Sequence, residues 1–241
     1  MEVTPEAGYK HLDRLEKNLR EDKPIQIYSE ETWPSKGQIE FRDLSIKYRP
    51  TLPFVIKNLS VKVTAGSKVG IVGRTGAEKT TLISSLYRTF DDYKGKILID
   101  SVEIREPGLK TLRQGMTIIS QDPYLFEDSL RHNIDPMGEF SDEEIEGILD
   151  DVGLWEKFVE LDGVHTKIEK DGGNLSQGEK KLVCMARALL FKKKVVLMDE
   201  TTSSLDMKTE QIIQRLIKER FKDCTVLVIA HRLNTILHCD K

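Results

Sequence analysis

Residues 73–80 of the chain read GRTGAEKT. This stretch departs at one position from the pattern G-x-x-x-x-G-K-[ST], a loop whose backbone N–H groups close around the phosphates of a nucleotide. Gly73, Lys79 and Thr80 stand where the pattern requires them, and Glu78 stands where it requires its last glycine. On this stretch alone, a phosphate-binding loop and a chance match both stay open, so the flanking sequence has to decide.

The segments on either side are the ones that a phosphate loop needs. KVGIVG at 68–73 is a short apolar run that predicts a strand. The stretch that follows the loop predicts a helix, because four apolar residues fall on one helical face: Leu82, Ile83, Leu86 and Phe90. The N-terminus of such a helix attracts phosphate, a lysine reaches the terminal phosphates and a hydroxyl binds Mg²⁺. Lys79 and Thr80 are the residues for those two tasks.

Two kinds of strand are predicted in the rest of the chain. GQIEFRDLSIKY at 37–48 and FVIKNLSVKV at 54–63 alternate apolar and polar residues, which favours an antiparallel pair. KVVLMDE at 194–200 and CTVLVIAH at 224–231 are continuous apolar runs. Such runs are typical of strands that are buried on both faces of a parallel sheet.

Helical periodicity predicts three further helices, the first of which opens with a capping box from Ser141 to Glu144. They cover residues 140–161, 178–191 and 209–221. Helices that join buried strands indicate an α/β fold with a parallel sheet. Near the N-terminus, the charged stretch at 10–23 is either a short amphipathic helix or a solvated tail, and a linker follows it up to residue 36.

Composition restricts the class of protein but not its partners. The 241 residues are 39% hydrophobic and 32% charged, as in an ordinary globular protein, and 40 acidic residues nearly balance 37 basic ones. A net charge of −3 gives no reason to expect nucleic acid or an anionic membrane as a direct partner. The longest apolar runs fall short of the ~20 residues that cross a bilayer, and there is no signal-peptide pattern. Three cysteines without C-x-x-C spacing fit reduced thiols better than a disulfide framework or a zinc site.

Two other stretches carry groups that a nucleotide site uses. Asp199 ends an apolar strand and is placed to hold Mg²⁺, and Glu200 beside it is placed to polarise an attacking water. NLSQGEKK at 174–181 is a loop of small residues ahead of a helix, and it can present N–H groups to an anion. Alone, the first stretch could be a strand that ends in solvated acids, and the second could be a simple helix cap.

Taken together and in this order, the motifs resemble the nucleotide-binding domain of the ATP-binding cassette (ABC) family. The resemblance runs from about Gly37 to the last residue. GRTGAEKT is similar to the Walker A loop, LSQGE at 175–179 to the signature motif, and VVLMDE at 195–200 to Walker B. Four single residues match further family motifs: Tyr48 the aromatic residue that stacks on adenine, Gln121 the Q-loop glutamine, Asp206 the end of the D-loop, and His231 the switch histidine.

The resemblance implies a fold and a division of the chain. It implies a P-loop NTPase (RecA-like) core with a mostly parallel sheet, an antiparallel β subdomain on the N-terminal side, and a helical subdomain that carries the signature motif. Residues 1–36 would form the N-terminal helix and linker, residues 37–241 the nucleotide-binding domain, and about 122–187 the helical subdomain.

The resemblance also implies ATP and Mg²⁺ as cofactors and assigns site residues. The catalytic group would be Glu200, His231 and Gln121, and the metal group Thr80, Gln121 and Asp199. Nucleotide contacts would come from Tyr48, Gly73, Arg74, Thr75, Gly76, Ala77, Glu78, Lys79, Thr80, Thr81, Leu175, Ser176, Gln177, Gly178, Glu179 and Asp206. Two cassettes of the family pair head to tail, so that loop 175–179 of each would close over the ATP held by its partner.

A finer resemblance is to the second cassette of the multidrug-resistance-protein branch, subfamily C. It rests on FRDLSIKYRPTLPFVIKNLS at 41–60, LVCMARALL at 182–190 and VLVIAHRLNTIL at 226–237. It implies an ATPase that powers export through transmembrane domains and lies at the cytoplasmic face of a membrane. As an isolated chain, the domain would be a soluble cytosolic protein.

Three departures from the family pattern keep a second function open. Glu78 adds a side chain and a negative charge where phosphate must approach. Gln177 and Glu179 replace residues of the usual signature motif. The chain also ends at Lys241, before the further strands of the family, so we expect an uncovered sheet edge. The alternative to a working ATPase is a degenerate cassette that binds ATP weakly and has a regulatory or scaffolding role.

Overall fold

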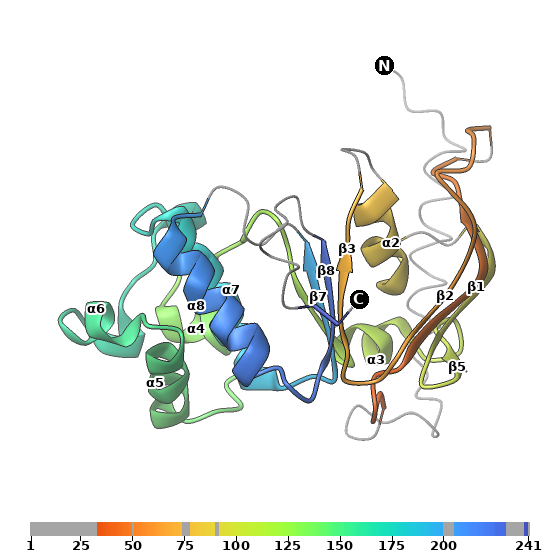
Figure 1. Cartoon of the computed structure of the whole chain (residues 1–241). Coiled ribbons are helices and arrows are strands. Elements are labelled where there is room, and N and C mark those ends of the chain that lie inside the picture. Colours follow the sequence, from red (N-terminus) through yellow and green to blue (C-terminus); the bar gives the residue numbers. More distant parts are fainter. Residues whose placement is uncertain are drawn as a thin grey trace, which may run out of the picture.

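The computed structural model describes residues 33–49, 51–73, 78–89, 92–199, 205–229 and 239–240. Two four-stranded sheets organise them, one antiparallel and one parallel. In Figure 1 the antiparallel sheet lies at one end of the molecule, the parallel sheet lies in the middle, and helices α4–α8 gather at the other end. The helix expected at 10–23 lies outside the described residues.

The antiparallel sheet has the strand order β2-β1-β4-β5. The predicted pair is confirmed as β1 (Ile39–Ile46) and β2 (Ile56–Val63), which run antiparallel. Two strands that the sequence analysis did not identify extend it, β4 (Tyr93–Ile99) and β5 (Val102–Glu103). The chain that enters this sheet is fastened to it, because the Trp33 indole N–H donates to the Ile99 carbonyl over 3.2 Å.

The parallel sheet has the order β3-β8-β7-β6, and all three of its pairings are parallel, as predicted. Its strands are β3 (Lys68–Ile71), β8 (Thr225–Ile229), β7 (Val195–Asp199) and β6 (Met116–Ile119). Among the described strands, β3 and β6 form the two edges. At Lys68 the β3 edge has a partner, because the Asp240 N–H donates to the Lys68 carbonyl over 2.7 Å and the Asp240 carboxylate accepts from the Lys68 N–H over 2.8 Å.

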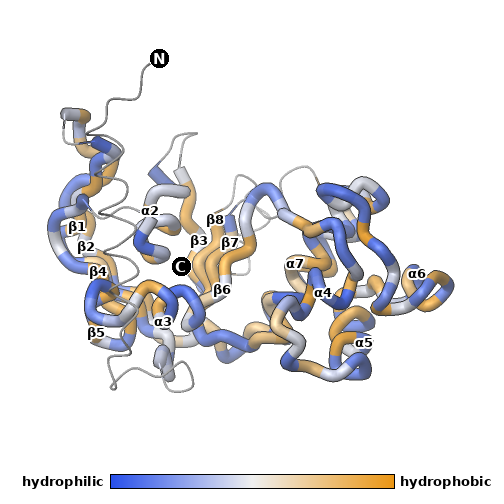
Figure 2. Tube along the Cα trace, turned by 180° about the vertical axis from the view of Figure 1, so that it is seen from behind, coloured by the Kyte–Doolittle hydropathy of each residue, from blue (hydrophilic) through white to orange (hydrophobic). Residues whose placement is uncertain are grey.

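The two apolar strands separate two hydrophobic clusters, because successive side chains of a strand point to opposite faces. Val196, Met198, Val226 and Val228 pack into one cluster with helices α4–α8. Val195, Leu197, Leu227 and Ile229 pack into the other with α2, α3 and the antiparallel sheet. Figure 2 shows both strands as hydrophobic. Burial of each such aliphatic side chain stabilises the fold by about 1.5–3 kcal/mol, so this central sheet holds the two halves of the domain together.

Nine helical segments surround the sheets in the described part of the chain. They are α2 (Glu78–Leu86), α3 (Leu109–Gln114), α4 (Leu130–Ile134), α5 (Asp142–Asp151), α6 (Trp155–Val159), η1 (Gly163–His165), η2 (Lys170–Gly172), α7 (Gln177–Phe191) and α8 (Met207–Glu219). The predicted helices after the phosphate loop, at 178–191 and at 209–221 correspond to α2, α7 and α8.

The single helix predicted at 140–161 is wrong: the segment forms two helices. α5 begins with the predicted capping box of Ser141 and Glu144 and ends at Asp151. Gly153 then has a φ of +72°, its N–H donates to Asp150, and the Leu154 N–H donates to Leu149. This is the Schellman termination, in which a glycine in the left-handed region ends a helix. Gly153 is therefore the reason that α6 is a separate helix.

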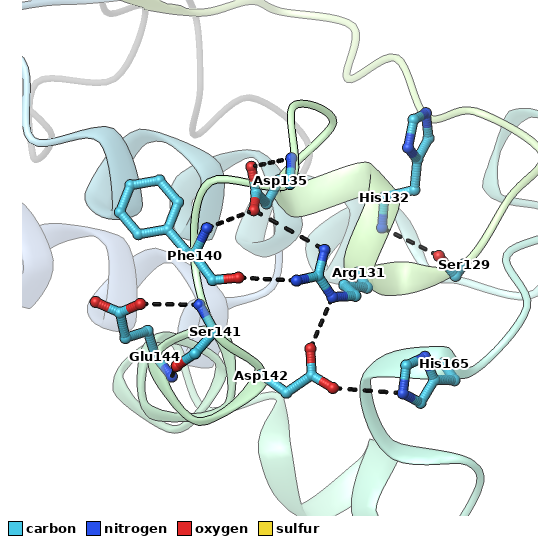
Figure 3. A network of polar contacts seen from close by, with 10 residues as sticks. Ser129, Arg131, His132, Asp135, Phe140, Ser141, Asp142, Glu144 and His165 are labelled. Atoms are coloured by element: carbon cyan, nitrogen blue, oxygen red, sulfur yellow. Dashed lines mark hydrogen bonds and ion pairs between the residues drawn. The ribbon is translucent and has the colours of Figure 1, made fainter.

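A polar network holds the connection between α4 and α5 (Figure 3). Arg131 on α4 donates from Nε to Asp142 over 2.7 Å and from Nη2 to the Phe140 carbonyl over 2.8 Å. The buried carboxylate of Asp135 accepts from the Phe140 N–H over 2.9 Å, and His165 Nε2 lies 3.4 Å from Asp142. The short turn between the two helices is thus fixed by side chains rather than by apolar packing alone.

Candidate phosphate site and signature loop

The carboxyl ends of the parallel strands meet along one edge of the sheet. Strand register places Ile71 and Asp199 opposite Ile229, and Ile119 opposite Met198. The segments that leave these strands therefore start at the same edge, where ligands of open α/β sheets bind. Gln121 follows β6 by two residues and is exposed there.

Lys79 lies in the first turn of α2 and points back across the start of the phosphate loop. Its Nζ donates to the Gly73 carbonyl over 3.2 Å, and the residue is only 6% exposed. An ammonium group has three donors, and it is the group with which the lysine of a phosphate loop reaches phosphate oxygens. The strand–loop–helix unit thus places the predicted lysine at the loop.

Thr80 and Asp199 come together from positions 119 residues apart. The Thr80 hydroxyl donates to Asp199 Oδ1 over 3.4 Å, and Asp199 is 7% exposed at the end of β7. Hydroxyl and carboxylate oxygens are the ligands that Mg²⁺ prefers, and this metal usually keeps few protein ligands beside phosphate oxygens and waters. The pair fits the predicted metal position.

Tyr48 and Thr81 are also in contact. The Tyr48 hydroxyl is hydrogen-bonded to the Thr81 hydroxyl, which belongs to α2 and is buried. Tyr48 itself is 42% exposed. The contact fixes the far end of the tyrosine ring beside α2 while part of the ring stays open, which suits an aromatic residue that stacks on a base. Thr81 therefore supports Tyr48, and its own contact with a nucleotide stays a prediction.

Glu78 is the first residue of α2, and it is exposed. A carboxylate in the first turn stabilises a helix, since it lies near the positive end of the helix dipole. The same end is the one that would attract phosphate. Glu78 thus carries its charge at the helix end that phosphate would approach.

The predicted signature loop forms the N-terminus of α7. The Ser176 hydroxyl accepts from the Glu179 N–H over 3.2 Å, and the Glu179 carboxylate accepts from the Ser176 N–H over 2.8 Å. Lys157 on α6 donates to the same carboxylate over 2.7 Å. Partial burial alone would raise the pKa of Glu179, but the bonds from Lys157 and Ser176 outweigh it and hold that pKa below its usual value. Glu179 is thereby a capping residue.

The other residues predicted for this loop differ in exposure. Leu175 is buried in the core, Gln177 is exposed, and Gly178 packs against the N-terminus of α8.

Asp206 caps α8: its carboxylate accepts from the backbone N–H of Thr209 over 3.0 Å and from the Thr209 hydroxyl over 2.7 Å, and these bonds lower its pKa.

Several predicted residues lie outside the described part of the chain, and their roles stay predictions. They are Arg74, Thr75, Gly76, Ala77, Glu200 and His231. Sequence analysis in turn missed Lys157 and Thr209. Nothing local marks Lys157, which is 22 residues from its partner, whereas the S-x-x-E pattern at 176–179 is a recognisable capping signal.

Comparison with known proteins agrees with this geometry. The family profile described as "ABC transporter" matches residues 56–203. The chain belongs to the ABC transporter family. As an ABC transporter cassette it is 33% identical to a solved bacterial Atm1-family ABC exporter with ATP bound, with a TM-score of 0.80. The match covers 86% of this chain and 36% of the exporter chain, and it confirms the predicted P-loop NTPase fold with its parallel and antiparallel sheets.

Curated relatives belong to subfamily C, as the finer resemblance predicted. The chain is 47% identical over 213 residues to ATP-binding cassette sub-family C member 3 of Mus musculus, and the aligned segment covers 88% of this chain and 14% of that protein. It is 41% identical over 239 residues to ABC transporter C family member 2 of Dictyostelium discoideum, and this alignment covers 99% of this chain and 17% of that protein. The chain thus spans about a sixth of the length of these relatives. Among the described residues, no helix combines the length and the apolar character needed to cross a bilayer.

Proposed function

We propose that this ABC cassette binds Mg-ATP and hydrolyses it as part of an exporter at the cytoplasmic face of a membrane. One observation carries the proposal: the Thr80 hydroxyl and the Asp199 carboxylate meet within 3.4 Å at the start of α2, next to Lys79. A chance match to the Walker A pattern would give no reason for a second, distant motif to end at the same place.

The residues of the site divide the work of binding. The Lys79 ammonium group would bond oxygens of the terminal phosphates, and Tyr48 would stack on the adenine ring. Thr80, Asp199 and Gln121 would hold Mg²⁺, which when bound neutralises the charge that develops on the phosphates. The Gly73 carbonyl, which accepts from Lys79, would hold that side chain at the start of the loop.

Hydrolysis would be an in-line displacement at the γ-phosphorus. Glu200 and His231 would orient a water, whose oxygen forms the new P–O bond while the bond to the bridging β–γ oxygen breaks. The water proton passes to Glu200, and ADP and phosphate leave. Loop 175–179 of a second cassette would complete each site, and closing and opening of the pair would drive the transmembrane domains.

The test is the Mg²⁺ dependence of ATP binding in two variants at Thr80. Thr80→Val removes the metal-binding hydroxyl and keeps the shape, whereas Thr80→Ser keeps the hydroxyl. We expect Thr80→Val to lose most of the gain in ATP affinity that Mg²⁺ provides, and Thr80→Ser to keep it. Equal behaviour of the two variants in a titration with a fluorescent ATP analogue would contradict the proposed site.

A second function is favoured by one observation, the exposed Glu78 in the first turn of α2. In a degenerate cassette this carboxylate would repel the phosphates, and the domain would bind ATP weakly and serve as a regulatory or scaffolding partner of an active cassette. Turnover measured with the domain in its paired state separates the two functions.

A further inference from the structure

Gly178, the second residue of α7, has no room for a side chain. A Cβ placed on its backbone would lie 2.9 Å from Thr209 Oγ1, 3.3 Å from Thr209 Cγ2 and 3.4 Å from Asp206 Oδ2. The distance to Thr209 Oγ1 is shorter than a non-bonded Cβ–oxygen contact in an ordinary protein. Gly178 does not have a positive φ, so its backbone conformation is open to any residue. The glycine is therefore required by the close approach of α8.

Thr209 cannot easily move away from this contact. It is a β-branched residue within the first turn of α8, where such side chains have few rotamers. Its hydroxyl donates to Asp206 Oδ2 over 2.7 Å, its N–H donates to Asp206 Oδ1 over 3.0 Å, and the residue is buried. The cap of α8 and the contact with Gly178 thus use the same side chain.

The contact joins two segments with different proposed tasks. α8 begins only a few residues after Asp199, the metal carboxylate at the end of β7. α7 begins with loop 175–179, which would face the ATP of the partner cassette. A displacement of the start of α8 would therefore push directly on the start of α7.

We propose that Thr209 is a positioning residue for loop 175–179, and that the Gly178–Thr209 contact makes the start of α7 follow the start of α8. This inference rests on the proposed function, because it assigns the contact to the pairing of two cassettes. The chain's own metal side and the loop that it offers to its partner would then be linked through one threonine.

Compensating substitutions test the contact in the protein joined to its partner cassette. Gly178→Ala should lower the melting temperature by roughly 2–10 °C because of the overlap with Thr209. It should also raise the Mg-ATP concentration for half-maximal pairing by about tenfold or more. Thr209→Ala in the Gly178→Ala background removes both crowded atoms and should recover most of each loss. Thr209→Val in that background keeps the bulk and should recover neither.

Gly147→Ala is the matched control, because a Cβ at Gly147 in α5 would meet nothing within 4 Å. It should leave stability and pairing unchanged or slightly improved. Nucleotide affinity of a single cassette separates positioning from general damage, since Thr209→Ala should leave that affinity within about twofold of the unchanged protein.

Two results would overturn the inference. The first is a loss of pairing in Gly178→Ala that Thr209→Ala does not recover, which would mean that the glycine serves the nucleotide side. The second is a rescue by Thr209→Val equal to that by Thr209→Ala, which would mean that the overlap is not the cause. If the unchanged protein neither pairs nor hydrolyses ATP, the proposed function fails. In that case recovery of the melting temperature still shows the contact, but the positioning role is refuted.

Discussion

Removal of the charge at Glu78 should change ATP affinity and domain stability in opposite directions. Two substitutions separate the causes. Glu78→Gln removes the charge and keeps the side chain, whereas Glu78→Gly also removes the Cβ and restores the residue that the phosphate-loop pattern requires.

The gain in affinity follows from the position of Glu78 at the start of α2. A unit charge about 4 Å from a phosphate charge is repelled by about 1 kcal/mol at the dielectric constant of water and by about 4 kcal/mol at an effective constant of 20. Because Glu78 is exposed, we expect the lower half of that range. Glu78→Gln should then tighten Mg-ATP binding by about 5- to 60-fold, and Glu78→Gly by at least as much.

The loss in stability follows from the same position. Glu78 is the acidic residue of the first turn of α2, which is worth about 0.3–1 kcal/mol near the helix dipole. Glu78→Gln should cost that amount, and Glu78→Gly about 1 kcal/mol more because of the low helix propensity of glycine. Urea unfolding without nucleotide measures both costs.

A fluorescent ATP analogue titrated at two salt concentrations measures the affinity, because salt screens the repulsion between exposed charges. Lys79→Ala in the Glu78→Gly background is the control, and it should abolish the gain. The reasoning is refuted if the unchanged protein already binds Mg-ATP at low micromolar concentration and neither substitution alters the affinity. Glu78 would then point away from the phosphates, and the ATPase would be favoured over the degenerate cassette.

Three other predictions concern the helical part of the domain. Glu179→Ala should lower the free energy of unfolding by about 1–2 kcal/mol, because it removes the cap of Ser176 and the ion pair with Lys157. Glu179→Gln keeps the cap and should lower that free energy by only about 0.2–1 kcal/mol. Equal losses for the two variants in urea unfolding would refute the cap. Because the pKa of folded Glu179 lies below its ordinary 4.5, its contribution to folding stability is present above pH 4.5 and is lost as the pH falls below it. Lys157→Met should make this loss of stability in acid smaller, as measured by the melting temperature at a series of pH values. Asp135→Ala should cost about 2–4 kcal/mol in urea unfolding, since the Gly138 and Phe140 N–H groups lose the buried carboxylate that accepts from both. Asp142→Ala, at a more exposed position, should cost under about 1 kcal/mol, and a reversed order would contradict the network of Figure 3.

Local patterns predicted the strands and helices around the phosphate loop. β7 and β8 are recognisable because their runs are apolar throughout, as the two clusters on either side of the sheet require. β1 and β2 were predicted from the alternation of apolar and polar residues, whereas β4 was missed because its first half, Tyr93 to Lys96, is largely polar and exposed. The break at Gly153 was missed because helical periodicity continues through it, and only the left-handed glycine ends the helix.

The site was predicted as motifs but not as contacts. Thr80 and Asp199 were assigned to one metal from separate motifs, and their approach needed only the common edge of a parallel sheet. The ion pair of Lys157 with Glu179 and the contact of Thr209 with Gly178 could not be predicted, since each depends on how two helices pack. Glu179 shows the difference: the sequence marked it only as a departure from the usual signature motif, and in the fold it caps its own helix.

Steady-state ATP turnover of the domain joined to its partner cassette, compared between the unchanged protein and Glu200→Gln, tests the central claim most directly. The substitution removes the carboxylate that would polarise water and spares Asp199 at the metal. We expect Mg-ATP binding to stay within about twofold while turnover falls at least about a hundredfold. An equal loss of binding and turnover, or turnover that Glu200→Gln leaves unchanged, would contradict the assignment of this ABC cassette as an ATPase.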